Sequence, residues 1–386
     1  MSEALSLARR GLYTTDPNPR VGCVLVRDGN VVGRGWHERA GEAHAEVNAI
    51  ADAGNDAQGA TAYVSLEPCC HHARTGPCTE ALIGAGVRRV VAAMTDPNPR
   101  VSGRGLARLE EQGMDVSSGV LEPAARALNP GFIKRMSSGS PYVRVKLAMS
   151  VDGRTAMASG ESQWITGPAA RRDVQRLRAR SSAIVTGVST VVSDDPSLTV
   201  RPEAFGQSDA LPPRQPLRVI MDSSGRTPAG AKLMTLPGET LIATCTASPE
   251  RLDSLRAAGA QTAVLPAQQH RVDLTALLSE LASREANEVL VEAGQTLAGA
   301  MLESGCVDEL IIYAAPKLLG AGARGLVELA GVSTLAQAVE LEFIDVRKVG
   351  TDIRLVLRPL PATPSFRPRA CCMLRAFCAP APSGTD

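Results

Sequence analysis

The sequence has 386 residues, of which 44% are hydrophobic and 21% are charged, so the chain can bury the cores of two or three domains. A net charge of +1 and an aromatic content of only 3% argue against binding of nucleic acid or a membrane through a broad basic face. Residues 1–10 lack the apolar core of a signal peptide, and no apolar run is long enough to cross a membrane. We therefore expect a cytoplasmic protein whose nine cysteines stay reduced, where clustered cysteines are typical metal ligands.

Residues 1–140 alternate between helical and strand patterns, which is typical of a layered α/β domain. An Asp28-Gly29 turn joins the first two strands, and Gly54 ends the helix that follows them. We expect helices over residues 2–11, 44–54, 79–86 and 103–113, and strands over 21–35 (two strands), 60–66, 87–94 and 114–120. The sequence MSSGSP at 136–141 predicts a linker.

A second α/β domain is predicted over residues 141–360. Its strands are expected over 142–150, 182–187, 217–222, 239–245, 261–266, 288–294, 308–316, 342–350 and 352–359, and its helices over 168–180, 250–258, 274–284 and 295–304. A polar, proline-containing loop is expected near 202–216. Residues 361–386 have no clear period and are rich in Pro and Ala, which predicts a disordered tail. Its three cysteines have no nearby histidine or fourth ligand, so no metal site is expected there.

Two segments of the first domain carry metal-binding side chains: GEAHAEVNAI contains His44 and Glu46, and LEPCCHHARTGPC contains Cys69 and Cys78. One His and two Cys satisfy a catalytic zinc, which takes three protein ligands and leaves one position for water. A neighbouring Glu can move a proton between that water and a leaving amine. Glu46 follows His44 by two residues, so both can reach the same point only at the tip of a helix. The sequence therefore predicts zinc at His44, Cys69 and Cys78, with Glu46 as the proton-transfer residue.

Other interpretations of these residues remain open. A structural zinc site would need a fourth ligand, which His71 or His72 could supply, and buried cysteines without metal are a further possibility. Cys70 competes with Cys69, but Pro68 before Cys69 matches the zinc-deaminase signature His-x-Glu … Pro-Cys-x-x-Cys. Eight residues rather than two separate Cys69 from Cys78, which disfavours the usual deaminases of nucleosides and nucleic acids.

The heptapeptide TDPNPRV occurs at residues 15–21 and again at 95–101. The flanking residues differ, so the repeat does not indicate a duplicated domain. One copy precedes a predicted strand and the other follows one, so both loops can lie at the same edge of one sheet. There Asn18 and Asn98 could offer a donor and an acceptor to a pyrimidine. The alternative is ordinary Asp-Pro-Asn-Pro turn chemistry.

The second domain gives weaker signals. In VLVEAGQTLAGAML, Gly294 permits a tight turn into a helix whose N-terminus can face a phosphate, but the Gly-x-Gly-x-x-Gly fingerprint is absent. Ser162 and Trp164 precede a helix with five arginines, of which most are expected to be solvated and one or two to hold a phosphate. TVVSDDPSLTVR is expected to be a second functional polar loop.

These motifs together resemble the bifunctional riboflavin-biosynthesis deaminase/reductase family over residues 1–358. The matching motifs are NPRVGCVLV, GEAHAEV, LEPCCHHARTGPC, DPNPRVSGRG, SVDGRTA, SQWIT, DDPSLTVR, VEAGQTLAGA and APKLLG. The resemblance implies an N-terminal cytidine-deaminase-like three-layer α/β/α domain followed by a dihydrofolate-reductase-like α/β domain. It implies zinc-dependent hydrolytic deamination of a diamino-hydroxy-phosphoribosylaminopyrimidine, then NADPH-dependent reduction of the ribosyl group to ribityl. It also implies a homo-oligomer.

The resemblance assigns more residues than the motifs alone. It assigns zinc to His44, Cys69 and Cys78, and proton transfer to Glu46. It implies deaminase-substrate contacts at Asn18, His37, His71, Asp96 and Asn98. It implies NADP contacts at Ala148, Thr155, Trp164, Thr190, Asp194, Ser223, Gly294, Gln295, Thr296, Leu297, Ala298, Gly299 and Ala300. It implies reductase-substrate contacts at Ser162, Arg178, Leu198, Arg201 and Glu292.

The chain departs from this family in its metal loop. The family usually has Ser at Cys70, Gly at Ala73 and Pro at Gly76, and it usually ends near Leu360. The sequence leaves three alternative functions open: a zinc deaminase of free nucleosides, an enzyme in which only one domain is active, and a non-catalytic zinc-stabilised binding protein.

Overall fold

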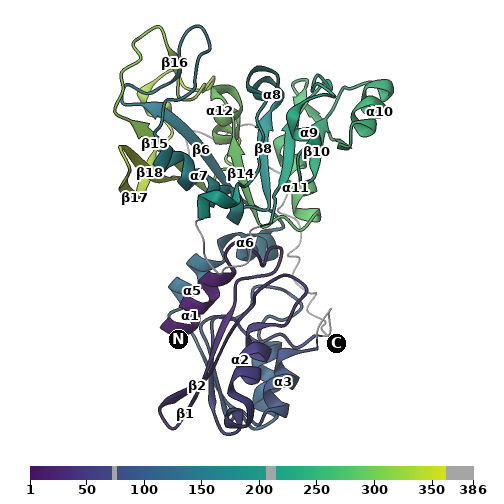
Figure 1. The fold of residues 1–386 in the computed structure, drawn as a ribbon, viewed down its shortest axis with the longest axis vertical. Helices are drawn as coiled ribbons and strands as arrows, with labels where there is room; N and C mark the ends of the chain where they lie inside the picture. The colour runs from purple at the N-terminus through teal and green to yellow at the C-terminus, as the bar shows by residue number, and fades with distance from the viewer. Residues whose placement is uncertain (72–75, 206–213, 362–386) are drawn as a thin grey trace, which may run out of the picture.

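The structure is a computed structural model that describes residues 1–71, 76–205 and 214–361. It has two lobes, each built around one main sheet, with the N-terminal lobe below the C-terminal lobe in Figure 1. The predicted tail from residue 362 and the family departure at Ala73 lie outside the described residues. Within them, no helix is long and apolar enough to cross a membrane.

The N-terminal sheet has five strands in the order β2-β1-β3-β4-β5. Strand β1 is antiparallel to β2 and β3, while β3, β4 and β5 are parallel. The strands are β1 (Gly22–Arg27), β2 (Asn30–Trp36), β3 (Thr61–Val64), β4 (Arg89–Ala92) and β5 (Asp115–Ser118). The helices are α1 (Ser2–Ala8), α2 (Ala45–Ala53), α3 (Cys78–Gly84), α4 (Arg104–Glu111), α5 (Glu122–Leu128) and α6 (Pro130–Ser138).

Glycines let helices approach both faces of this sheet. A Cβ atom at Gly22 would lie 2.1 Å from the carbonyl oxygen of Ala4 in α1, and one at Gly35 would lie 2.2 Å from that of Ala45 in α2. Helices α1 and α2 therefore pack directly on the backbone of β1 and β2. This gives the predicted three-layer α/β/α arrangement.

The structure corrects the predicted linker at 136–141. Helix α6 begins at Pro130 and continues through Ser138, so half of that segment is helical. The start and end signals are present in the sequence: Pro130 stands at the first helical position, and Gly139 ends the helix with φ 69°. The serines at 137 and 138 stay helical while their hydroxyls donate to carbonyl oxygens of the preceding turn.

The C-terminal sheet has nine strands in the order β11-β10-β9-β8-β14-β6-β15-β18-β17. The first seven in that order are parallel, and β18 and β17 continue the sheet antiparallel. The strands are β6 (Tyr142–Ser150), β8 (Ala183–Gly187), β9 (Leu217–Met221), β10 (Thr240–Thr244), β11 (Gln261–Val264), β14 (Glu288–Glu292), β15 (Glu309–Ala315), β17 (Leu341–Val349) and β18 (Asp352–Pro359). Two small sheets pair β7 (Arg154–Ala156) with β16 (Arg324–Gly325), and β12 (Ala267–Gln268) with β13 (Arg271–Val272).

The parallel strands are buried on both faces, which explains their continuous apolar sequences. Val145, Val185, Val289 and Val291 lie in the main core and are at most 1% exposed. The helices of this domain are α7 (Pro168–Arg180), α8 (Val188–Asp194), α9 (Lys232–Thr235), α10 (Pro249–Ala257), α11 (Leu274–Ser283) and α12 (Gln295–Glu303).

Helix α8 corrects another prediction. The segment TVVSDDPSLTVR was expected to be a loop, but Thr190 and Asp194 lie in α8. Val188 and Val191 are three residues apart and buried, so they hold one face of this short helix against the core. The β-branched residues and the Ser-Asp-Asp run disfavour a helix locally, and tertiary packing overrides that preference.

The two domains meet at the amino ends of the C-terminal parallel strands. Glu288, the first residue of β14, is 1% exposed and pairs with Arg20 of the N-terminal domain at 2.7 Å. Arg144 of β6 and Arg180 of α7 also bind this carboxylate. A buried charge cluster therefore joins one domain to the other, while the carboxyl ends of the strands face away from this junction.

Candidate active sites

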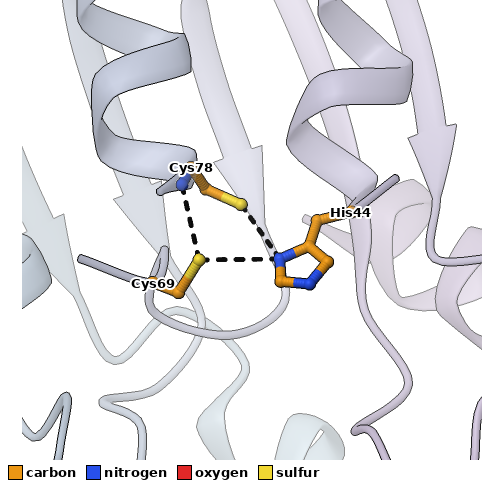
Figure 2. A group of neighbouring side chains, drawn as sticks. All are labelled: His44, Cys69 and Cys78. Atoms are coloured by element: carbon orange, nitrogen blue, oxygen red, sulfur yellow. Dashed lines mark hydrogen bonds between the residues drawn. The ribbon is translucent and has the colours of Figure 1, made fainter. Parts of the chain in front are cut away.

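The three predicted metal ligands converge in the N-terminal domain (Figure 2). The Nδ1 atom of His44 lies 3.2 Å from the Sγ atom of Cys78 and 3.5 Å from that of Cys69. The backbone N–H of Cys78 donates to Cys69 Sγ at 3.4 Å. The three ligand atoms all lie within 4.8 Å of one another, so a single ion can contact all of them.

Two helix starts position two of these ligands, His44 and Cys78. His44 precedes α2 in extended backbone, with φ −77° and ψ 166°, and Cys78 is the first residue of α3. The backbone N–H groups at helix starts favour negative charge, which suits thiolate ligands. The expectation that His44 and Glu46 share a helix tip is confirmed.

The pKa shifts of the three cluster residues are compatible with binding of a divalent cation. Hydrogen bonds lower the pKa of Cys69 to about 4, although burial opposes this shift. The Cys78 thiol makes the larger contribution, and His44 makes a smaller one. The hydrogen bond to Cys69 raises the pKa of His44, and the hydrogen bond to Cys69 together with burial raises that of Cys78. These shifts favour a thiolate at Cys69, and a metal would replace the protons of the other ligands. One imidazole and two thiols match a three-ligand zinc site.

Glu46 lies in the first turn of α2 and is 3% exposed. Burial, with a further contribution from Cys69, raises the pKa of its carboxyl to about 7. A carboxyl with a pKa near neutrality can both accept and release a proton at little cost. Glu46 therefore has the property that proton transfer beside the ligand cluster requires.

The two adjacent cysteines have different environments. Cys69 belongs to the cluster, whereas Cys70 does not, and burial raises the pKa of the Cys70 thiol. Among the described residues, no fourth His, Cys, Asp or Glu joins the three ligands. His71 stays outside the cluster, and within the described chain its buried Nδ1 atom has no hydrogen-bond partner. A closed four-ligand site is therefore not formed by these residues, while His72 lies outside the described range.

Both copies of TDPNPRV lie at the same edge of the N-terminal sheet, as predicted. The first copy leads into β1 and the second follows β4, and the antiparallel pairing of β1 with β3 brings these ends together. In the first copy, Asn18 Nδ2 lies 3.0 Å from His37 Nε2. His37 Nδ1 lies 3.0 Å from the carbonyl oxygen of Ala43. Since that carbonyl can only accept, Nδ1 carries the proton and Nε2 accepts from Asn18.

His37 connects this loop to the metal cluster. It is 2% exposed, burial lowers its pKa, and its ring stands edge-on to that of His44 with centroids 5.2 Å apart. In the second copy, burial raises the pKa of Asp96 to about 7. Asp96 Oδ1 accepts from the backbone N–H of Asn98 at 2.8 Å. The structure thus brings four predicted substrate residues, Asn18, His37, Asp96 and Asn98, to one end of the sheet.

Sequence reasoning missed Glu67, which organises the second loop. Its carboxylate accepts backbone N–H groups from Asp96 at 2.9 Å, Gly103 at 2.9 Å and Gly105 at 2.8 Å. It is 3% exposed and stands two residues before Cys69. An acidic residue immediately after an apolar strand was the available signal.

In the C-terminal domain, Arg178 and Glu292 bind one another directly. Arg178 Nε lies 2.6 Å from Glu292 Oε1, and Nη2 lies 3.0 Å from Oε2. Arg178 Nη1 also donates to the carbonyl oxygen of Thr199 at 3.1 Å, which brings in the loop that contains Leu198 and Arg201. Lys146 of β6, which sequence reasoning missed, lies 3.9 Å from Glu292. Although burial opposes it, these two cations lower the pKa of Glu292.

Most predicted cofactor residues line the carboxyl ends of the parallel strands. Ala148 lies near the end of β6, Ser223 follows β9, and Gly294 follows β14, while Thr190 and Asp194 lie in α8 after β8. This edge is where open parallel sheets bind ligands. Thr155 and Trp164 lie instead in the connection from β6 to α7, where Thr155 Oγ1 donates to Gly325 and Lys317 donates to the Trp164 carbonyl.

Helix α12 divides the predicted run 294–300 into two parts. Ala298 is fully buried in the core, and a Cβ atom at Gly299 would lie 1.8 Å from the carbonyl oxygen of Glu328. Gly294 and Thr296 are exposed, and Gln295, Leu297 and Ala300 are partly exposed. The first turn of α12 is therefore the part that can face a ligand.

The arginine-rich helix α7 is less solvated than predicted. Arg172 and Arg176 are exposed, but Arg178 and Arg180 are largely buried and bind Glu292 and Glu288. Arg171 stacks over the ring of Trp164 at 4.7 Å. The helical pattern alone could not reveal carboxylates more than 100 residues away.

The fold and these two sites define a class of protein: a zinc-binding deaminase domain joined to an α/β reductase domain. Residues 1–94 match the family model for the "Cytidine and deoxycytidylate deaminase zinc-binding region", and residues 141–355 match that for the "RibD C-terminal domain".

Relatives cover nearly the whole chain. It is 54% identical to the riboflavin biosynthesis protein RibD of Escherichia coli K12 over 363 residues, which is 92% of this chain and 98% of that protein. The RibD of Haemophilus influenzae is 47% identical, with 93% and 96% covered. Among solved structures, Acinetobacter baumannii RibD (form 1) has a TM-score of 0.86 at 46% identity, covering 93% of this chain and 98% of that chain. A Thermotoga maritima diaminohydroxyphosphoribosylaminopyrimidine deaminase/5-amino-6-(5-phosphoribosylamino)uracil reductase has a TM-score of 0.81 at 30% identity, covering 93% and 97%.

The chain therefore belongs to the RibD family of riboflavin biosynthesis proteins. It is a bifunctional enzyme of the riboflavin pathway with a deaminase, which is a hydrolase, and an NADP-dependent reductase. Its cofactors are Zn²⁺ and NADPH. The fold class predicted from the sequence, a cytidine-deaminase-like domain followed by a dihydrofolate-reductase-like domain, is confirmed.

Proposed function

We propose that the enzyme first deaminates 2,5-diamino-6-hydroxy-4-(5-phosphoribosylamino)pyrimidine and then reduces 5-amino-6-(5-phosphoribosylamino)uracil. In the first step water replaces an exocyclic amino group, and ammonia leaves. In the second step NADPH supplies a hydride and a proton is added, so that the ribosyl group becomes ribityl. Residues 1–140 form the deaminase domain in this proposal, and residues 141–360 form the reductase domain.

The convergence of His44, Cys69 and Cys78 is the observation that carries the deaminase proposal. These three residues hold Zn²⁺, which when bound acts as a Lewis acid and lowers the pKa of water. Glu46 takes a proton from the attacking water and returns it to the leaving amine, as its pKa near neutrality favours.

A comparison of the two adjacent cysteines tests this ligand set. The Cys69→Ser variant should lose bound zinc because it removes a thiolate from the cluster, whereas the Cys70→Ser variant should keep about one zinc per chain. Metal content of the purified proteins, measured by elemental analysis, gives the answer without any activity assay. Loss of zinc from Cys70→Ser with retention in Cys69→Ser would reverse the assignment.

The deaminase substrate is bound, in this proposal, by the two sheet-edge loops and their neighbours. Asn18 and Asn98 present amide groups to the pyrimidine edge, and His37, His71 and Asp96 complete the contacts. The buried Nδ1 atom of His71, which lacks a partner among the described residues, supports this role because a ligand would satisfy it.

The reductase substrate is bound by Ser162, Arg178, Leu198, Arg201 and Glu292 in this proposal. The contact of Arg178 with both Glu292 and the carbonyl oxygen of Thr199 supports it. NADPH is held along the carboxyl ends of the strands. The proposed contacts are Ala148, Thr155, Trp164, Thr190, Asp194, Ser223 and the run Gly294, Gln295, Thr296, Leu297, Ala298, Gly299 and Ala300.

We also propose a cytoplasmic homo-oligomer. The six described cysteines are free thiols, as a reducing compartment maintains. Strand β17 forms one edge of the C-terminal sheet and exposes Phe343 and Val346, at 64% and 55%, which is typical of a contact surface. Sedimentation of the wild type and a Phe343→Asp variant tests this proposal: a monomeric wild type would contradict it.

A further inference from the structure

The two identical copies of TDPNPRV are held in different ways. In the second copy the loop makes its own turn: Asp96 Oδ1 accepts from the backbone N–H of Asn98 at 2.8 Å, two residues further on. Glu67, from the same domain, accepts a hydrogen bond from the backbone N–H of Asp96, with an N···Oε2 distance of 2.9 Å. The second loop therefore obtains its shape from within the deaminase domain.

In the first copy, the aspartate side chain binds residues of the C-terminal domain. Asp16 Oδ1 accepts from Ser182 Oγ at 2.8 Å and from Asn287 Nδ2 at 3.0 Å, and Asp16 Oδ2 pairs with Arg214 at 2.8 Å. The backbone N–H of Asn18 donates instead to the carbonyl oxygen of Thr15 at 2.8 Å. The same sequence thus adopts a different turn, and the C-terminal domain supplies the partners of its carboxylate.

Asn287 is the residue best placed to fix this loop. It is 4% exposed, and it stands one residue before β14. Its Nδ2 donates both to Asp16 and to the carbonyl oxygen of Pro17, the latter at 2.8 Å. Its Oδ1 accepts from Arg135 Nε at 2.7 Å. Because every polar group of this amide has a partner, its orientation is fixed.

The first TDPNPRV loop is also held at Arg20, two residues after Asn18. Arg20 binds Glu288 at 2.7 Å, and its backbone N–H donates to Asn129 Oδ1 at 2.8 Å. Asn18 therefore lies between two attachments to residues 287 and 288. From there its amide reaches His37, whose ring packs against the zinc ligand His44.

We propose that Asn287, a residue of the reductase domain, is a positioning residue for the deaminase reaction: by holding Asp16 and Pro17 it sets Asn18 against His37 and the pyrimidine. This inference rests on the proposed role of Asn18 in binding the deaminase substrate. One strand then serves both reactions, because β14 begins beside Asn287 and ends at Glu292, which is proposed to bind the reductase substrate.

The test uses the full-length, zinc-loaded enzyme with two separate assays: ammonia release from the diamino substrate, and NADPH oxidation with the pre-deaminated substrate. Asn287→Ala should raise the KM for deamination about 10-fold, with a smaller change in kcat, because it removes hydrogen bonds that position a binding group. Both reductase parameters should stay at wild-type values. Ser182→Ala removes a different contact to Asp16 and should raise the same KM.

Lys134→Ala is the matched control. It breaks another contact between the domains, the 2.6 Å pair of Lys134 with Asp308, which lies outside the loop, and it should leave deamination unchanged. The double variant Asn18→Ala/Asn287→Ala adds a thermodynamic cycle. If Asn287 acts through Asn18, the double variant should be no worse than Asn18→Ala alone.

The other outcomes overturn the inference in distinguishable ways. An unchanged deaminase KM in Asn287→Ala, with a raised KM in Asn18→Ala, removes the role of Asn287 and leaves the proposed function intact. An unchanged KM in Asn18→Ala removes the substrate role of Asn18 and the inference with it. Equal loss of both activities in Asn287→Ala, or additive effects in the double variant, shows a general structural role instead.

Discussion

The buried carboxylates of the two domains are in opposite electrostatic environments. In the deaminase domain, burial raises the pKa values of Glu46 and Asp96 to about 7. In the reductase domain and at its junction, arginine and lysine side chains overcome burial and lower the pKa values of Glu288 and Glu292. A carboxyl near neutrality suits proton transfer, whereas a permanently ionised one suits binding and structural support. The carboxyls of Glu46 and Asp96 are therefore suited to proton transfer, and those of Glu288 and Glu292 to holding a charge.

Loss of the buried, ion-paired carboxylate of Glu288 should destabilise the protein strongly. Glu288→Gln removes the charge that compensates Arg20, Arg144 and Arg180, and it should lower the free energy of unfolding by about 3–5 kcal/mol. Urea denaturation measures this. Glu342→Gln is the control because Glu342 pairs with Arg358 at the exposed surface, where the change should be under about 1 kcal/mol. Equal midpoints for the two variants would contradict a structural role for the cluster.

The destabilisation caused by Glu288→Gln should depend on pH. Burial alone would raise the pKa of Glu288, but Arg180, Arg20 and Arg144 hold it well below its usual range. Its stabilising effect is therefore complete above the pKa of the unfolded chain, about 4.3, and is lost as the pH falls toward the folded value. The stability gap between wild type and Glu288→Gln should shrink between pH 5 and pH 3. A gap that is constant in urea titrations across this range would contradict the assigned ionisation.

For Glu46 in the metal-free protein, we expect a smaller pH-dependent change in the free energy of unfolding, with the opposite sign. Since burial raises its pKa to about 7, the folded state loses stability as the pH rises toward and through that value and a charge forms without a cation. Glu46→Gln stays neutral, so its advantage over wild type should grow by on the order of 2 kcal/mol between pH 5 and pH 8. Thermal or urea unfolding of both apo proteins measures it. If wild type instead gains stability relative to Glu46→Gln between pH 5 and pH 8, Glu46 has a cationic partner.

The convergence of His44, Cys69 and Cys78 could be predicted from the sequence because zinc needs few donors and the chain supplies them in two short segments. His44 and Glu46 had to share a helix tip, and Pro68 distinguished Cys69 from Cys70, so local geometry constrained the answer. The position of both Asn-Pro loops at one sheet edge also followed from the order of strands. These features depend on short motifs and on the order of strands along the chain, both of which the sequence contains.

What the sequence could not reveal depends on distant partners. Asn287 is 271 residues from Asp16, and no pattern in either segment indicates that one binds the other. Most of the five arginines of α7 were expected in solvent, but Arg178 and Arg180 are held by Glu292 and Glu288 of β14, which no local pattern reveals. Helix α8 formed against local propensity because Val188 and Val191 pack into the core. Each of these depends on how separate elements come together.

The coupling of the two reactions is tested by NADPH oxidation in the purified enzyme given the diamino substrate, with wild type and Glu46→Gln compared. If both sites are active, wild type should oxidise NADPH with this substrate. The variant should do so only with the pre-deaminated substrate, because loss of the proton-transfer group should slow deamination by about 10²–10⁴-fold. A wild type that consumes NADPH only with the pre-deaminated substrate would contradict an active zinc site in this chain, and Cys70 would then be the first residue to examine.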